Sequence, residues 1–278
     1  MLSRSVPTIT IDDRHRRPIP KTNTDRGLLN SKMGQPVRDI PLREQQHPTI
    51  RQLSDTISRT WQDELDLSSY QTPEDLGYVE GSLEGERLTI QNYCYQTPQF
   101  RKLHLELARI GKSLDILHCV MFPRPNFKLP ILGIDIVAGR GQISAAIVDL
   151  SPVARDRALP SPYPEKLSSL PPVKFSQPRE LPAWGKIFSD YCLFVRPVGD
   201  AEEAAFIDRV TQYLALHVQQ AKAAMPVGSI EEEAAILAGQ RHYCLKQQQN
   251  DKTRRVLENA FGPEWADRYV RTMLFDVM

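Results

Sequence analysis

Hydrophobic and polar residues alternate through the middle of the chain with the period of β-strands. Between Phe100 and Leu150 four such runs are separated by short turns that contain glycine or proline. Side chains repeat every two residues along a strand, so each run can gather its apolar residues on one face. Because parallel strands need a crossover of about a dozen residues, turns this short predict antiparallel neighbours. Residues 77–97 predict a further hairpin that turns at Glu84 and Gly85.

Helical spacing appears on both sides of these strands. From His47 to Leu67 apolar residues recur at steps of three and four, which predicts one amphipathic helix. Residues 151–183 are rich in proline and predict an irregular connection across the surface. Residues 187–197 predict another strand, and helical patterns follow it to the end of the chain.

Two of the three closing helices carry start signals. Asp200 with Glu203, and Ser229 with Glu232, have the spacing of capping boxes, in which two side chains satisfy free backbone N–H groups. The last helix is interrupted at Gly262 and the proline after it. We therefore expect helices that begin at Asp200 and Ser229, followed by a broken terminal helix.

The strand around His118 is apolar on both faces, so it needs a covering layer on each side. The order of elements is a helix, six or seven antiparallel strands and then helices. This order predicts the α/β class, as a three-layer α/β/α sandwich around a central, mostly antiparallel sheet. We expect this fold to occupy residues 47–278 as a single domain.

The first 46 residues differ in character from the rest. Residues 1–46 lack any periodicity and are rich in proline, arginine, aspartate, asparagine and threonine, which predicts a disordered N-terminal extension. Transit peptides are poor in acidic residues, so Asp12, Asp13 and Asp25 argue against that alternative. A further alternative is that translation starts later, at Met33 or beyond.

Composition excludes several classes of protein. A content of 41% hydrophobic and 25% charged residues is ordinary for a soluble globular protein, and the net charge of +1 gives no signature for nucleic-acid binding. No apolar run approaches the ~18–20 residues of a membrane span. The four cysteines lack any C-x-x-C spacing, so we interpret them as reduced thiols. We expect a cytoplasmic monomer.

Ionisable side chains interrupt the apolar strands at four positions. His104 and Glu106 alternate with leucines on one strand, while His118 and Asp135 each lie among apolar neighbours on the next two. A lone buried charge costs several kcal/mol unless it is paired or neutralised. Each of the four alone could be a hydrogen-bonded core residue. Together, on three consecutive strands, they predict a pocket lined with proton donors and acceptors.

The chain lacks the usual motifs for carrying electrons or phosphate. No G-x-G-x-x-G opens a helix, no phosphate-binding loop occurs, and no cysteine set could hold an iron–sulfur cluster. His104 and His118 could join Glu106 and Asp135 as a 2-His-carboxylate metal site, which we keep as an alternative. Otherwise any redox chemistry must draw electrons from outside the chain and protons from these side chains.

Four long segments are distinctive. They are GYVEGSLEGERLTIQNYCYQTPQFRKLHLELARIGKSLDILHCVMFP, GIDIVAGRGQISAAIVDLSP, PRELPAWGKIFSDYCLF and QQQNDKTRRVLENAFG. They closely resemble the ferredoxin-dependent bilin reductases of cyanobacteria, from about Glu44 to the C-terminus. The resemblance implies an α/β/α sandwich with no bound cofactor, which takes single electrons from ferredoxin and binds biliverdin IXα between the sheet and the C-terminal helices.

The resemblance also implies a reaction and its residues. Biliverdin IXα would be reduced to phycocyanobilin in two successive two-electron steps through substrate radicals, first at the D-ring vinyl group and then at the A-ring. Glu106 matches the family's donor to the D-ring vinyl group. His118 and Asp135 match the proton relay at the pyrrole system, and His104 is bridged to His118.

Further matches concern the propionates of the substrate. The family pattern points to Arg179 and Lys252 as their cationic anchors, and places Asn250 and Asp251 beside the pocket. Two alternatives stay open: a bilin carrier without turnover, and a sister reductase with another product. A carrier needs no Glu106 together with a proton relay, so the sequence favours the reductase.

Overall fold

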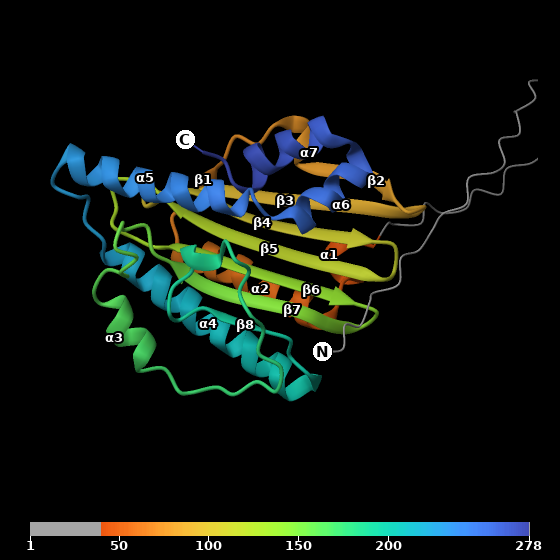
Figure 1. The fold of residues 1–278 in the computed structure, drawn as a ribbon, viewed down its shortest axis with the longest axis horizontal. Coiled ribbons are helices and arrows are strands. Elements are labelled where there is room, and N and C mark those ends of the chain that lie inside the picture. Colours follow the sequence, from red (N-terminus) through yellow and green to blue (C-terminus); the bar gives the residue numbers. More distant parts are fainter. Residues whose placement is uncertain (1–39, 278) are drawn as a thin grey trace, which may run out of the picture. The chain divides into compact units, whose positions relative to one another are not determined.

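An antiparallel sheet lies at the centre of the computed structural model, which describes residues 40–277 (Figure 1). Within this part of the chain the sheet has eight strands, and from β3 to β8 each strand pairs with the next one in sequence. β1 and β2 both pair with β3. The strands are β1 (Ser68–Ser69), β2 (Tyr78–Leu83), β3 (Glu86–Gln96), β4 (Phe100–Ile110), β5 (Leu114–Pro123), β6 (Ile131–Gly139), β7 (Gln142–Ser151) and β8 (Leu193–Val195).

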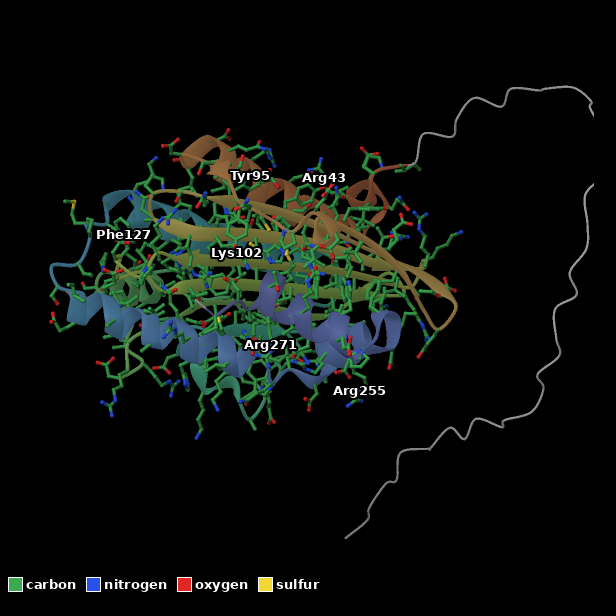
Figure 2. All side chains as sticks on the ribbon, turned by 90° about the horizontal axis from the view of Figure 1, so that it is seen from above. Arg43, Tyr95, Lys102, Phe127, Arg255 and Arg271 are labelled. Carbon is green, nitrogen blue, oxygen red and sulfur yellow. The ribbon has the colours of Figure 1, made fainter. Side chains whose placement is uncertain are left out.

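Helices cover both faces of this sheet (Figures 1 and 2). One face packs against α1 (Leu42–Gln45), α2 (Pro48–Glu64), α3 (Tyr163–Ser168) and α4 (Gly199–Ala223). The other packs against α5 (Ile230–Gln247), α6 (Asp251–Phe261), α7 (Pro263–Tyr269) and a π-helical turn, η3 (Val270–Leu274). Short 3-10 turns lie at η1 (Glu74–Leu76) and η2 (Gly185–Ile187). The predicted three-layer α/β/α sandwich is therefore confirmed.

The period-two pattern explains why two separate cores form. Leu103, Leu105 and Leu107 of β4 are fully or almost fully buried on the face that packs against α2. Val120 and Phe122 of β5 are fully buried on the opposite face, under α5 and the C-terminal turn. The central strands are therefore covered on both sides, as their nearly continuous apolar sequence indicates.

Of the two predicted capping boxes, one cap is confirmed. The Ser229 hydroxyl accepts a hydrogen bond from the Glu232 N–H at 3.1 Å, so that cap is confirmed. The predicted box at Asp200 is wrong. Gly199 has φ of +70°, and α4 begins there without a side-chain cap, which places Asp200 inside the first turn. The Glu202 carboxylate instead accepts from the Val198 N–H at 2.9 Å.

Three further boundaries differ from the prediction. The expected strand over residues 187–197 shrinks to Leu193–Val195, because η2 and a turn precede it. The proline-rich connection contains α3. Residues 40–46 of the predicted extension are described, and they include α1 with its buried Leu42, so that boundary was placed too late. Residues 1–39 lie outside the described part of the chain.

No helix in the described part of the chain is long and apolar enough to cross a membrane. The longest, α4, spans Gly199–Ala223 and carries charged residues in its first and last turns. It packs by Phe206, Val210 and Leu214 against the sheet. Its amphipathic character therefore matches a surface helix of a sandwich.

We expect His217 of α4 to lower the free energy of unfolding as the pH falls below neutral. The imidazole ring is fully buried, and its Nδ1 lies 2.8 Å from the hydroxyl oxygen of Tyr163. Burial lowers the pKa of His217 to about 3. The unfolded chain takes up the proton first, so this contribution to stability is complete above about pH 6.5 and is lost as the pH falls. Between pH 7 and pH 5 this residue alone should remove about 2 kcal/mol of stability, measured by denaturant unfolding as the difference between the parent and the variant His217→Gln at each pH. The comparison with the variant is needed because burial raises the pKa of Asp149 to about 6, which changes stability in the opposite direction over this range.

The variant His217→Gln should lose less stability than the parent between pH 7 and pH 5, since glutamine does not titrate. His242→Gln, at an exposed position of α5, is the matched control and should keep the slope of the parent protein. An equal slope in the His217→Gln variant would show that other groups cause the loss of stability.

Candidate active site

Strand register brings the predicted ionisable residues into one row. Asn92, Glu106, His118 and Asp135 are directly opposed partners on β3, β4, β5 and β6. Opposed side chains lie on the same face at about 5 Å. His104 precedes Glu106 by two residues on β4 and therefore shares that face. The structure thus places all four predicted residues together, on the face covered by the C-terminal helices.

Direct contacts join the members of this row. His118 Nδ1 lies 2.6 Å from Asp135 Oδ1. The rings of His104 and His118 meet edge to face, with centroids 5.8 Å apart. His104 is fully buried, and Glu106 and His118 are 8% and 7% exposed. The side chain of Asp135 is 45% exposed, so a ligand on this face would meet Asp135 first.

Burial and nearby charges shift the pKa of each group in this row differently. Burial raises the pKa of Glu106, which favours the neutral acid. Burial also lowers the pKa of His104 well below its usual value, with Lys102 and His118 adding to the effect. For His118 burial acts in the same direction, but the charge and hydrogen bond of Asp135 outweigh it and raise the pKa. These shifts favour the neutral forms of Glu106 and His104 and the cation of His118.

Two residues of the site were not predicted. The Tyr269 hydroxyl, from α7, lies 2.6 Å from Glu106 Oε2 and 3.0 Å from Asn92 Oδ1. Asn92 Oδ1 is in turn 2.7 Å from His104 Nε2. The alternation of β3 could have placed Asn92 on the same face as Glu106. No pattern in the sequence indicates which turn of a distant helix would reach the sheet, so Tyr269 carried no such signal.

The C-terminal segment covers the buried end of the row. The ring of Phe275 meets His118 edge to face, with centroids 5.5 Å apart. Asp276 then pairs with both Arg101 and Lys102 of β4. Lys102, which lies within the sheet layer in Figure 2, is fully buried, and its Nζ donates to the Met273 carbonyl oxygen at 2.7 Å. The C-terminal segment thus covers Glu106 and His118, where the sequence predicts a pocket.

Replacing Asp276 with asparagine should destabilise the protein by about 3 kcal/mol, the low end of the range for breaking a buried ion pair. Lys102 would keep its buried ammonium group without a counter-charge, and removing one partner of a buried pair leaves such a charge uncompensated. The value lies at the low end because the Asp276 side chain is 19% exposed. Denaturant unfolding would measure it. Asp267→Asn, which breaks exposed pairs with Arg254 and Arg271, should change stability little, and an equal loss there would contradict the prediction.

The open part of the same face continues from Asp135 as an apolar floor. Asp135, Ile147 and Phe194 are directly opposed on β6, β7 and β8, and all three are partly exposed. The guanidinium of Arg179 lies 5.3 Å above the centre of the Phe194 ring. Its Nη1 donates to the Ser144 carbonyl oxygen at 2.5 Å. Arg179, predicted as a propionate anchor, thus lies at the edge of this floor.

The other predicted anchors lie at the start of α6. Asn250 caps that helix, because its Oδ1 accepts a hydrogen bond from the Lys252 N–H at 3.2 Å. Asp251 and Lys252 are exposed. None of the contacts found among residues 40–277 joins these three side chains to the row. Their predicted role beside the substrate therefore stays a prediction.

Among the described residues, no group of three histidine, cysteine, aspartate or glutamate side chains could hold a metal ion. The alternative of a 2-His-carboxylate centre therefore finds no ligand set in this part of the chain. The imidazoles are engaged elsewhere, His104 by Asn92 and His118 by Asp135. Fold and site together define a class of protein with a buried acid beside a histidine–aspartate pair on one face of an antiparallel sheet, exposed at Asp135.

Comparison with known proteins identifies the family. Residues 54–276 match the family model of the ferredoxin-dependent bilin reductases. The phycocyanobilin:ferredoxin oxidoreductase of Trichodesmium erythraeum (strain IMS101) is 60% identical over 232 residues, which cover 84% of this chain and 94% of the relative. That of Synechococcus elongatus (strain ATCC 33912 / PCC 7942 / FACHB-805) is 58% identical over 239 residues, covering 86% and 96%. The chain belongs to the ferredoxin-dependent bilin reductase family, which confirms the resemblance.

A solved structure shows the same fold. Phytochromobilin synthase from tomato, in complex with biliverdin, superposes with a TM-score of 0.68 over 81% of this chain and 82% of its own. The two sequences are 16% identical, so this likeness concerns the fold alone. The family match and the named relatives make the chain an oxidoreductase that acts on linear tetrapyrroles.

Proposed function

We propose that this protein reduces biliverdin IXα to phycocyanobilin in two successive two-electron steps, with ferredoxin as the electron donor. The relatives at 58–60% identity are named phycocyanobilin:ferredoxin oxidoreductases, which supports the product and the electron donor of this proposal. The observation that carries the proposal is the row of Glu106, His118 and Asp135 across neighbouring strands. Such a row can supply protons at more than one point of a long, flat substrate.

Each two-electron step needs two electrons and two protons. Ferredoxin delivers its electrons singly, so the substrate itself holds an unpaired electron between transfers, and no bound cofactor is required. Glu106, favoured as a neutral acid, donates a proton toward the D-ring vinyl group. The pair of His118 and Asp135 passes protons to the pyrrole system, and His104 supports His118 through their edge-to-face contact.

The substrate is proposed to lie on the apolar floor beside Asp135. Biliverdin is flat and apolar with two propionates, and Ile147 and Phe194 present partly exposed apolar surface on the same face. Arg179 and Lys252 would bind the propionates, and Asn250 and Asp251 would lie nearby. Ferredoxin is acidic, so we propose that it docks near Arg255, which lies on the outer side of the C-terminal layer (Figure 2). A single chain supplies the whole row, so the protein is proposed to work as a monomer.

Replacing Arg179 with glutamine should weaken biliverdin binding about tenfold, since charge-assisted hydrogen bonds to a carboxylate are among the stronger polar contacts. Absorbance titration would measure the dissociation constant. Lys252→Gln should have a similar effect if it holds the second propionate. Arg59→Gln, on α2 of the opposite face, is the control. Unchanged affinity in both site variants would contradict the proposed anchors.

A second candidate function is a bilin carrier without turnover. The test adds biliverdin, ferredoxin and a reducing system to the full chain without oxygen. Conversion of the absorbance of bound biliverdin to that of a reduced bilin supports the reductase. An absorbance that stays that of bound biliverdin favours the carrier. A reduced product that keeps its D-ring vinyl group would instead indicate a sister reductase with another product.

A further inference from the structure

The orientation of the Asn92 side chain is fixed by a backbone group. Asn92 Nδ2 lies 2.7 Å from the Leu76 carbonyl oxygen. A carbonyl oxygen only accepts hydrogen bonds, so the amide nitrogen must be the atom that faces it. The Asn92 Oδ1 therefore points to the other side, toward His104 and Tyr269.

Both groups that face Asn92 Oδ1 must donate to it, because an amide oxygen only accepts. His104 Nε2, at 2.7 Å, donates its N–H, which sets the tautomer of this neutral ring. The Tyr269 hydroxyl, at 3.0 Å, donates its O–H. A hydroxyl has one proton, so the Tyr269 oxygen has only acceptor positions left for its second contact.

That second contact is with Glu106. The Tyr269 oxygen lies 2.6 Å from Glu106 Oε2, a normal length for a hydrogen bond between two oxygens. Since Tyr269 has given its proton to Asn92, Glu106 must provide the proton for this bond. The contacts are thus satisfied together only when Glu106 is the neutral acid.

We propose that Asn92 and Tyr269 are positioning residues that keep Glu106 protonated, so that it can act as a proton donor. The inference deepens the proposed function and rests on it for the role of Glu106. The order of donors runs from Glu106 to Tyr269 to Asn92, and the Leu76 carbonyl fixes its direction. In the opposite order, with Glu106 ionised, the oxygens of Tyr269 and Asn92 would face each other without a proton.

This hydrogen-bond order opposes the effect of the neighbouring cation on the protonation of Glu106. His118 is its cross-strand neighbour on β5 and, as a cation, favours the ionised carboxylate. Asp135 on β6 acts in the opposite direction, and His104 on β4 is neutral. Tyr269 faces Glu106 from α7. Asn92 and Tyr269 therefore oppose the loss of the proton toward His118.

The packing of α7 holds the tyrosine in place. Tyr269 is fully buried, and the Trp265 ring stacks on it with centroids 4.8 Å apart and an interplanar angle of 12°. Phe261 continues the stack, with its ring centroid 4.2 Å from that of Trp265. The stack of Trp265 and Phe261 therefore fixes the plane of the tyrosine ring and with it the position of the hydroxyl oxygen.

Infrared spectroscopy of the substrate-free protein tests the proposal without turnover. The carboxylic-acid band of Glu106 is assigned by its absence in Glu106→Gln, and its loss is followed as the pH rises. In Asn92→Leu the Tyr269 proton is released to face Glu106 and stabilise the carboxylate. The midpoint should then fall by about one pH unit, the effect of about one hydrogen bond.

A double-mutant cycle makes the test specific. Asn92 acts through the tyrosine hydroxyl, so Asn92→Leu should leave the midpoint unchanged in a Tyr269→Phe background. Tyr163→Phe removes an equally buried hydroxyl near His217 and is the matched control, with the midpoint of the parent. Circular dichroism checks folding, and Asn92→Ala replaces the leucine variant if that one does not fold.

The outcomes separate this inference from the proposed function. An Asn92 variant with an unchanged midpoint would mean that Tyr269 already donates to an ionised Glu106, and would overturn the proposal. A lowered midpoint together with about tenfold slower D-ring reduction and biliverdin affinity within about twofold supports it. A lowered midpoint in a protein that reduces no bilin would leave the proton order standing and refute the proposed function alone.

Discussion

Replacing Asp135 with asparagine should reduce turnover of biliverdin by about 10²-fold or more, while biliverdin still binds. The reason lies in its 2.6 Å contact with His118. Asparagine can accept the same hydrogen bond, but it carries no charge. Burial would then dominate and lower the pKa of His118, so the imidazole would lose the proton that it passes to the substrate.

Single-turnover absorbance measurements with reduced ferredoxin, without oxygen, would follow this loss. Asp208→Asn, at an exposed position of α4 on the opposite face, is the control and should keep the rate of the parent. An Asp135→Asn variant with unchanged turnover would count against the proton relay. Loss of binding as well would instead show that Asp135 chiefly holds the substrate.

Replacing Glu106 with glutamine should stall reduction of the D-ring vinyl group by about 10²–10⁴-fold, the contribution of a general acid. Glutamine has almost the same shape and can still bond to Tyr269, so the site should stay folded and bind biliverdin. Chromatography after anaerobic turnover should find bilin whose D-ring vinyl group is intact.

Glu165→Gln, an exposed substitution in α3, serves as the control for this variant. A normal yield of phycocyanobilin from Glu106→Gln would refute the assignment of Glu106 as donor. Loss of binding would show that the glutamate is needed for the shape of the site rather than for its proton.

Local pattern predicted the sheet and most of the site. Alternation along β4 places His104 and Glu106 on one face, and the short turn at Gly111 leaves little freedom in how β5 pairs with it. His118 and Asp135 follow in register for the same reason. Where neighbouring strands are joined by turns of a few residues, sequence spacing nearly determines which side chains meet.

The rest of the site depends on contacts between distant segments. Tyr269 reaches Glu106 across a sequence separation of 163 residues, and Asp276 reaches Arg101 across 175. Such contacts follow from how helices pack on the sheet, for which no spacing in the sequence is a guide. The wrong helix start at Asp200 has a different cause, because Gly199 adopts a backbone conformation that shifted the first turn.

The most direct test of the account is anaerobic turnover of the parent protein with reduced ferredoxin in D₂O, with the product identified by chromatography and mass spectrometry. Electrons arrive without hydrogen, and every added hydrogen comes from side chains that exchange with solvent. We therefore expect phycocyanobilin that carries one deuteron for each electron it accepted, before any back exchange. Unchanged biliverdin, or a reduced product without deuterium, would contradict the claim that this row of side chains supplies the protons.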